Sequence, residues 1–361
     1  MKALLQPLAD LAGYDDLCRQ LRNNRGVIEI TGCLESQKAH LAAGLAENFD
    51  AVLLIAENEL KARALYEDCR LYDPDVLYYP RKDLIFYQAD LSGNLLTRQR
   101  MQVIKTIAEQ KQKRITIVTS TGGCMDLLLP FRVFENSSLT IAGGDHLDLQ
   151  EISRKLADMG YERFGAVEAS GQFAVRGDIL DVYPLTEELP WRIEFWDDEI
   201  DSIRSFDPQS QRSVENLEEV TIFPATEEPG KESDEKAFYR RLTDTFPDYL
   251  PKNSLIILDE PTRILENAGA LFAEYSEAMK HRLEEGQVSA AEAKRMITPD
   301  MLAAGLSRSN CVALSLMDHT EKRLDVREKH TILARSVSSY NNQFPMLVKD
   351  LRRLKKDGFR A

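Results

Sequence analysis

The sequence predicts an α/β protein whose parallel-sheet domain is split along the chain by an inserted, smaller β-rich α+β domain. Continuous apolar strands alternate with helical segments at first, strands of alternating polarity follow, and a buried-strand pattern then resumes at Leu255. Continuous apolar strands are typical of parallel sheets covered on both faces, whereas alternating strands indicate antiparallel pairing. The expected parts are the first α/β segment, the β-rich domain, the second α/β segment and a basic helical tail, at 1–127, 128–223, 224–340 and 341–361.

The first α/β segment is expected to contain four strands and three helices. Each strand is a short run of apolar and β-branched residues, and helical stretches separate the runs, a pattern that favours βαβ units. Pro80 ends the third strand because it has no N–H to donate. The expected strands are 27–31, 51–55, 76–80 and 115–119, and the expected helices are 37–48, 60–71 and 98–112.

The β-rich domain is expected to form antiparallel hairpins over 173–184 and 191–206. In the second hairpin, apolar residues alternate with charged ones, and Asp197-Asp198 would form the turn. A helix is expected over 148–159, with Gly160 suited to its C-terminal cap. Period-two patterning places Trp191, Phe195 and Phe206 in the core, and Tyr78, Tyr79, Phe86 and Tyr87 are expected in core and rim packing.

The remainder of the chain mixes a linker with a second run of strands and helices. Thr226–Lys236 is acidic and contains Pro-Gly, which predicts a linker or exposed loop. A buried strand at Leu255–Leu258 precedes further helices and strands. Met346–Lys356 is predicted as an amphipathic basic helix. An apolar strand is expected to begin at Phe359–Ala361, which predicts that the chain is a fragment of a longer protein.

Composition narrows the class of protein. The chain has 361 residues, 43% hydrophobic and 29% charged, which is typical of folded proteins rather than disordered ones. No apolar run approaches the roughly 18 residues of a membrane span, and Met1–Gly13 lacks a signal-peptide pattern, so the cytoplasm is the expected compartment. The net charge of −13 argues against general nucleic-acid binding. Five cysteines without CxxC spacing and five scattered histidines argue against a disulfide framework or a metal site.

A phosphate-binding loop is nearly present where a strand meets a helix. Gly32 begins a stretch that occupies the place of a GxxxxGK[ST] loop. Gln37 replaces the second glycine, and its Cβ should hinder the backbone from wrapping phosphates. Ala39 lacks the hydroxyl that would hold magnesium, and Glu35 adds negative charge. Lys38 remains and is expected to be solvated. The loop is therefore predicted to be inactive.

Asp259 and Glu260 follow the apolar strand 255–258. They resemble the acidic pair that positions magnesium and water in NTPases. Such a strand ending is common, but beside the altered loop it indicates NTPase ancestry without activity. No catalytic residue, metal ligand or cofactor is predicted for this chain.

Two long blocks carry a resemblance to a known family. They are Gly171–Pro184 (GQFAVRGDILDVYP) and Arg192–Asp207 (RIEFWDDEIDSIRSFD), extended by Gln211-Arg212-Ser213. With the altered loop, they resemble the UvrB-homology module of the bacterial transcription-repair coupling factors (Mfd), over essentially the whole chain. The α/β domain is then of a degenerate helicase type. UvrB itself has a functional loop and a long aromatic DNA-probing hairpin, whereas only residues 88–97 separate Tyr87 from Arg98 here.

The resemblance implies functions for the β-rich domain and for parts of the family's proteins that this chain lacks. It implies that the β-rich domain recruits the repair ATPase UvrA by imitating UvrB. RNA polymerase and DNA would be bound through missing domains, and ATP and magnesium would belong to a missing C-terminal translocase motor. An intramolecular contact with that C-terminal part is also implied.

Arg176, Phe173 and Arg163 are the predicted UvrA-contacting residues, since arginine and aromatic side chains are favoured at interfaces. The structural alternative for Arg176 is an intrastrand or cross-strand salt bridge. Arg192, Glu194 and Arg204 are interpreted as structural hairpin charges. Two other functions remain open: an active UvrB-like, DNA-handling NTPase, and an intramolecular clamp that holds the translocase inactive.

Overall fold

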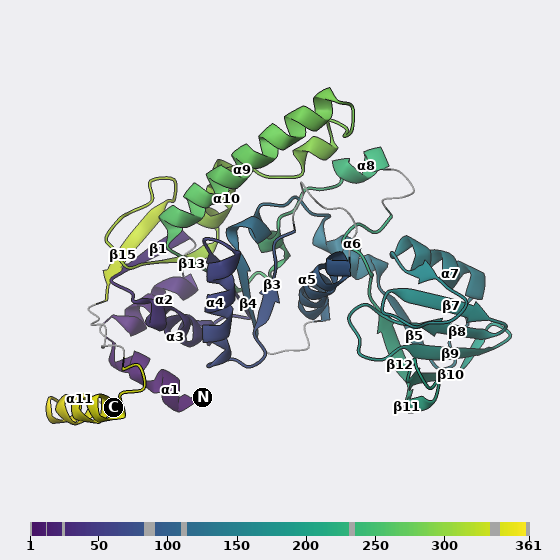
Figure 1. Ribbon diagram of the computed structural model, residues 1–361, viewed down its shortest axis with the longest axis horizontal. Coiled ribbons are helices and arrows are strands. Elements are labelled where there is room, and N and C mark those ends of the chain that lie inside the picture. The colour runs from purple at the N-terminus through teal and green to yellow at the C-terminus, as the bar shows by residue number, and fades with distance from the viewer. Residues whose placement is uncertain are drawn as a thin grey trace.

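The computed structural model describes residues 2–11, 13–23, 26–82, 91–109, 114–230, 235–332 and 340–358. An α/β domain built on a seven-stranded sheet lies beside a β-rich domain with a six-stranded and a two-stranded sheet (Figure 1). This arrangement confirms the predicted fold class. Predictions for Phe86, Tyr87, 88–90 and 359–361 concern residues outside the described ranges. Within those ranges, no helix has the length and apolar character needed to cross a bilayer.

The α/β domain contains most of the helices. Its strands are β1 (Gly26–Thr31), β2 (Ala51–Ala56), β3 (Leu77–Tyr79), β4 (Ile115–Ser120), β13 (Ser254–Asp259), β14 (Asn310–Ser315) and β15 (Val326–Thr331). Its α-helices are α1 (Lys2–Leu5), α2 (Tyr14–Asn23), α3 (Glu35–Ala46), α4 (Glu59–Arg70), α5 (Leu91–Glu109), α6 (Phe131–Ser137), α8 (Glu235–Arg240), α9 (Pro261–Glu284) and α10 (Pro299–Arg308). Its 3-10 turns are η1 (Gln6–Asp10), η2 (Thr121–Cys124), η3 (Phe246–Tyr249) and η4 (Glu292–Lys294). The predicted basic tail helix is present as α11 (Phe344–Lys356), and none of its residues is buried.

All seven strands of this sheet run parallel, in the order β15-β1-β14-β13-β2-β4-β3. Successive residues of β2 point to opposite faces, so Leu53 and Ile55 join one core while Val52 and Leu54 join another. Helices α2, α3 and α4 cover the second core, and α5, α9 and α10 cover the first. Both faces are buried, as the continuous apolar strands predicted.

The β-rich domain has its own core. Its strands are β5 (Leu139–Ala142), β6 (Glu162–Arg163), β7 (Gln172–Arg176), β8 (Ile179–Val182), β9 (Trp191–Trp196), β10 (Glu199–Phe206), β11 (Ser213–Leu217) and β12 (Glu219–Ile222), and its helix is α7 (Leu149–Asp158). The larger sheet has the order β11-β10-β9-β8-β7-β6, and β12 pairs with β5. Helix α7 packs Ile152 and Leu156 against one face of the larger sheet.

The expected local features of this domain are present. Trp191, Phe195 and Phe206 are buried, and Asp197 has a positive φ of 61° in the β9–β10 turn. The Asp148 side chain caps α7 by accepting hydrogen bonds from two backbone amides. Gly160, with φ of 88°, follows the helix because a Cβ there would strain the backbone and meet Thr226.

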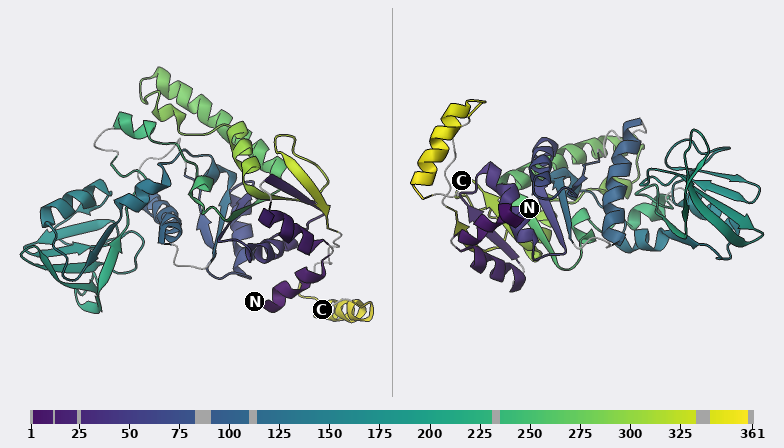
Figure 2. Two further views of the ribbon diagram at one scale, coloured as in Figure 1. Left: turned by 180° about the vertical axis from the view of Figure 1, so that it is seen from behind. Right: turned by 90° about the horizontal axis from the view of Figure 1, so that it is seen from below.

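The junction between the domains corrects one prediction. The chain leaves the large sheet after β4 and returns to it at β13, so the β-rich domain is inserted (Figures 1 and 2). Thr226–Lys236 was expected to be a linker or exposed loop, but within it Glu227 and Pro229 are buried; residues 231–234 lie outside the described ranges. Glu227 is buried because it forms an ion pair with Arg100 of α5 inside the α/β domain. Composition alone did not reveal this partner.

Candidate functional site

Side chains and backbone groups of the chain itself contact the altered phosphate loop. Gly32 has φ of 76°, and a Cβ there would lie 2.2 Å from the carbonyl oxygen of Ile332, so this position requires glycine. The side-chain Oε1 of Gln37 accepts a hydrogen bond from the backbone N–H of Leu34 at 3.1 Å. Gln37 therefore satisfies an amide at the start of α3 that a phosphate would bind in an active loop. Ala39 is buried against the core.

Lys38 is buried, which contradicts its prediction as a solvated side chain. It is only 2% exposed, its Nζ forms an ion pair with the Asp259 carboxylate, and Glu260 Oε1 lies 2.9 Å away. Burial alone would lower the pKa of Lys38, but the two carboxylates reverse this effect and raise the pKa above its ordinary value. Lys38 is therefore charged at neutral pH and already paired.

The acidic pair, Asp259 and Glu260, also makes its contacts within the chain. Asp259 ends β13, and Glu260 follows in the left-handed region with φ of 61°. Besides binding Lys38, Glu260 Oε1 accepts a hydrogen bond from the backbone N–H of Leu316 at 3.0 Å. Lys38 therefore balances the charge of these carboxylates. The described part of the chain contains no cluster of three or more His, Cys, Asp or Glu side chains suited to a metal ion.

We predict that the chain does not bind Mg-ATP at millimolar concentration in a calorimetric titration. Binding would require Lys38 to leave two buried carboxylates and Gln37 to release the Leu34 amide. Micromolar binding that disappears in Lys38→Ala would contradict this prediction and support the NTPase alternative.

The second candidate site is the solvent-side face of the six-stranded sheet, called here the outer face. Strand register defines it, because residues directly opposite on paired strands share a face. Arg176 pairs with Ile179, which pairs with Glu194, and Asp181 pairs with Arg192. The outer face comprises Arg176, Ile179, Asp181, Arg192, Glu194, Trp196, Ser202 and Arg204.

The charges of the outer face form two preorganised groups. Asp181 is buried beneath two arginines: it accepts hydrogen bonds from Arg192 at 2.7 and 2.9 Å and from Arg176 at 2.5 Å. The Arg192 guanidinium also lies over the Phe206 ring, 4.4 Å from its centroid. In the second group, Arg204 pairs with Glu194. Arg192, Glu194 and Arg204 thus make the contacts within the sheet that their interpretation as hairpin charges predicted.

The three predicted contact residues lie in different environments. Arg176 is on the outer face with 46% of its side chain exposed, and its salt bridge crosses from β7 to Asp181 of β8. Arg163 is exposed on β6, but its register partner is Phe173, so it belongs to the opposite face of the sheet. Phe173 packs in the core, where its side chain is inaccessible to a partner. The alternation that buries Trp191 and Phe195 also governs Phe173 in β7.

Trp196 is a feature that sequence reasoning missed. It is 79% exposed at the end of β9, beside the Asp197-Asp198 turn. The alternation that placed Trp191 and Phe195 in the core also assigns Trp196 to the opposite face, so the signal was present in the sequence.

A buried charge network inside the α/β domain, close to where the chain returns from the β-rich domain, was also missed. Arg100, fully buried in α5, binds Glu227 at 2.6 Å and approaches Asp126 to 3.7 Å. Its guanidinium lies 4.2 Å from the centroid of the Tyr79 ring. Burial raises the pKa of Asp126 to about 6, although Arg100 opposes this effect. No local sequence pattern indicated this network, because its members come from distant segments.

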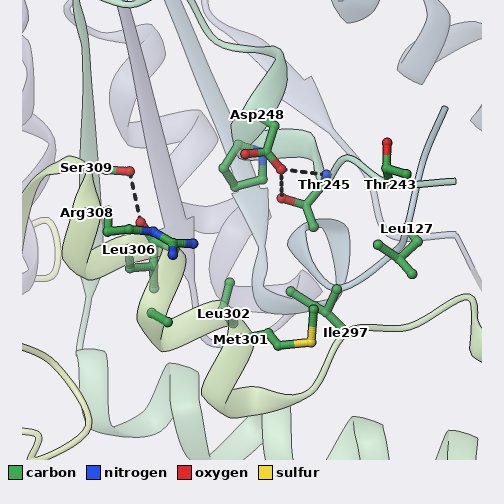
Figure 3. A pocket seen from close by; sticks show the side chains of 13 residues that line it. Leu127, Thr243, Thr245, Asp248, Ile297, Met301, Leu302, Leu306, Arg308 and Ser309 are labelled. Carbon is green, nitrogen blue, oxygen red and sulfur yellow. Dashed lines mark hydrogen bonds between the residues drawn. The ribbon is translucent and has the colours of Figure 1, made fainter. Parts of the chain in front are cut away.

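A cavity of about 500 Å³ lies between α10 and the segment around η3. Leu127, Ile297 and Leu302 contribute apolar side chains, and Thr245, hydrogen-bonded to Asp248, contributes a polar part of the lining (Figure 3). The lining extends along α10 as far as Ser309, just before β14, and it also includes Leu127, which follows η2. None of the residues that line this cavity belongs to the altered phosphate loop, which lies at the carboxyl ends of the parallel strands, where open α/β sheets bind ligands.

The known proteins to which this chain is similar include several transcription-repair-coupling factors. Residues 139–227 match a protein family described as the UvrB interaction domain. The chain is 28% identical to the transcription-repair-coupling factor of Bacillus subtilis, over 91% of this chain and 33% of that protein. It is 28% identical to the factor of Staphylococcus haemolyticus, over 72% and 26%, and 34% identical to that of Staphylococcus aureus, over 55% and 17%. The chain thus spans about a third or less of these relatives.

Proposed function

The chain is homologous to the N-terminal UvrB-homology module of the transcription-repair-coupling factors, and on that premise we propose that it is a non-catalytic docking module that recruits UvrA in nucleotide excision repair. The outer face of the β-rich domain would form the docking surface. Full-length factors would contact RNA polymerase and DNA, and use ATP and magnesium, through other parts. The proposed site of action is the cytoplasm.

The observation that most supports this proposal is a difference between the two candidate sites in how accessible their side chains are to a partner. Lys38 of the phosphate loop is buried and paired with Asp259 and Glu260, whereas Arg176, although paired with Asp181, is 46% exposed on the outer face and Trp196 is 79% exposed there. A face whose charges are already positioned loses little conformational entropy on association. This contrast favours docking over the alternative of an active NTPase.

We predict that Arg176→Ala weakens UvrA binding by about 2–4 kcal/mol if Arg176 meets a carboxylate across a desolvated interface. Arg176→Glu should weaken binding further, because it introduces repulsion. The fold should remain intact, because Asp181 keeps its two hydrogen bonds from Arg192. Calorimetric binding to purified UvrA, with a thermal melt of each variant, measures both effects.

Arg154→Ala is the matched control, since Arg154 is also exposed but lies on α7, which packs against the opposite face of the sheet. We expect its affinity for UvrA to equal that of the unmodified chain. Unchanged affinity in both Arg176 variants would remove Arg176 from the docking surface, and a loss confined to Arg154→Ala would move that surface to the side of the sheet that α7 covers.

A further inference from the structure

Trp196 is an unusually exposed aromatic side chain on an otherwise well-paired sheet. It is 79% exposed, whereas the chain's second tryptophan, Trp191, is 9% exposed and packs in the core of the β-rich domain. Among the described residues, none stacks on the Trp196 ring or accepts a hydrogen bond from its indole N–H. Its apolar surface therefore contributes little to the fold and remains available to a partner.

The position of Trp196 relative to Arg176 follows from the strand register. Arg176, Ile179 and Glu194 form one row across β7, β8 and β9. Trp196 lies two residues beyond Glu194 on β9, on the same face. With strands about 4.8 Å apart and a rise of about 3.4 Å per residue, the backbones at Arg176 and Trp196 are about 12 Å apart. One partner surface can therefore contact both side chains.

The residues around Trp196 define the chemistry of that surface. Asp197, Asp198 and Glu199 follow it directly and are exposed. Asp198 is hydrogen-bonded to His146, so the turn that carries the tryptophan is held in place. An apolar ring bordered by carboxylates is complementary to an apolar pocket with basic side chains at its rim.

We propose that Trp196 is an anchor of the outer face, inserting into an apolar pocket with a basic rim on the docked partner, about 12 Å from the group that receives Arg176. This inference rests on the proposed function and adds a residue and a pocket chemistry to it. Tryptophan and arginine together provide the residue types that most often dominate binding energy at interfaces.

The test combines affinity with tryptophan fluorescence, using the chain and purified UvrA. Trp196→Ala should weaken binding by about 30-fold or more, and Trp196→Phe by less, because the smaller ring retains apolar contact. Thermal melts of both variants should match that of the unmodified chain, because Trp196 makes no core contact. The fluorescence difference between complexes of the unmodified chain and of Trp196→Phe isolates Trp196, which should shift to shorter wavelength on binding as water leaves its ring.

The outcomes separate this inference from the proposed function. If UvrA binds Trp196→Ala as tightly as the unmodified chain, or if Trp196 emission stays at its solvent-exposed wavelength in a saturated complex, the anchor is overturned and docking stands. If the unmodified chain does not bind UvrA, both are overturned. Arg176→Ala serves as the matched variant: at saturation it should still show the Trp196 shift, despite weaker binding.

Discussion

Lys38→Ala is expected to destabilise the chain by about 3–5 kcal/mol, the usual cost of removing one partner from a buried ion pair. Asp259 would remain buried beside Glu260 without the cation that balances them. Urea unfolding at neutral pH, followed by circular dichroism, measures the change. Because the pKa of Lys38 is raised on folding, its stabilisation is complete below the unfolded pKa of about 10.4 and is lost as pH rises through the folded value.

Two further variants distinguish charge pairing from simple truncation. Lys61→Ala removes an exposed lysine paired with Glu35 and should change stability by less than about 1 kcal/mol. Lys38→Met combined with Asp259→Leu removes the main pair together and should restore much of the lost stability. A Lys38→Ala variant as stable as Lys61→Ala would show that the buried pair does not hold the loop closed.

Arg100→Met is expected to cost about 3–5 kcal/mol as well, because it leaves Glu227 and Asp126 buried without their central cation. Methionine retains much of the side-chain volume, so the loss reflects charge more than a cavity. Burial alone would raise the pKa of Glu227, but Arg100 and Lys82 reverse this and lower it. Unfolding in urea, monitored by circular dichroism, measures the loss.

The Arg100→Met deficit should depend on pH. In the unmodified chain, Glu227 contributes stability above its unfolded pKa of about 4.3, and that contribution is lost as pH falls through the lower folded value. The variant lacks the Arg100 part of this contribution and must bury Asp126 and Glu227 without that guanidinium, while Lys82 remains 3.7 Å from Glu227. Its deficit should therefore be larger at pH 7.5 than at pH 5. An equal deficit at both pH values would indicate that packing, not charge, accounts for the effect.

The sequence predicted elements better than side-chain environments, and for a physical reason. Strands such as β2 and β4 are continuous apolar runs, so local pattern determines them. The environments of Lys38 and Glu227 depend on partners far along the chain, Asp259 and Arg100, which local pattern does not reveal. The outer face is an intermediate case. The alternation of apolar and polar residues along each strand indicates which side chains lie on it. Phe173, however, was predicted as a partner contact from its residue type and not from its place in that alternation.

The order of strands in the large sheet has a consequence for synthesis on the ribosome. Strand β1 is made early, but its neighbours β14 and β15 both follow the inserted domain. Because the ribosome adds about 5–20 residues per second, β14 is synthesised on the order of tens of seconds after β1. During that interval β1 cannot form hydrogen bonds with its neighbouring strands. The β-rich domain, whose described strands pair only with one another, can finish folding in that interval. The apolar residues of β1 are thus exposed to chaperones and to aggregation longer than any segment of the inserted domain.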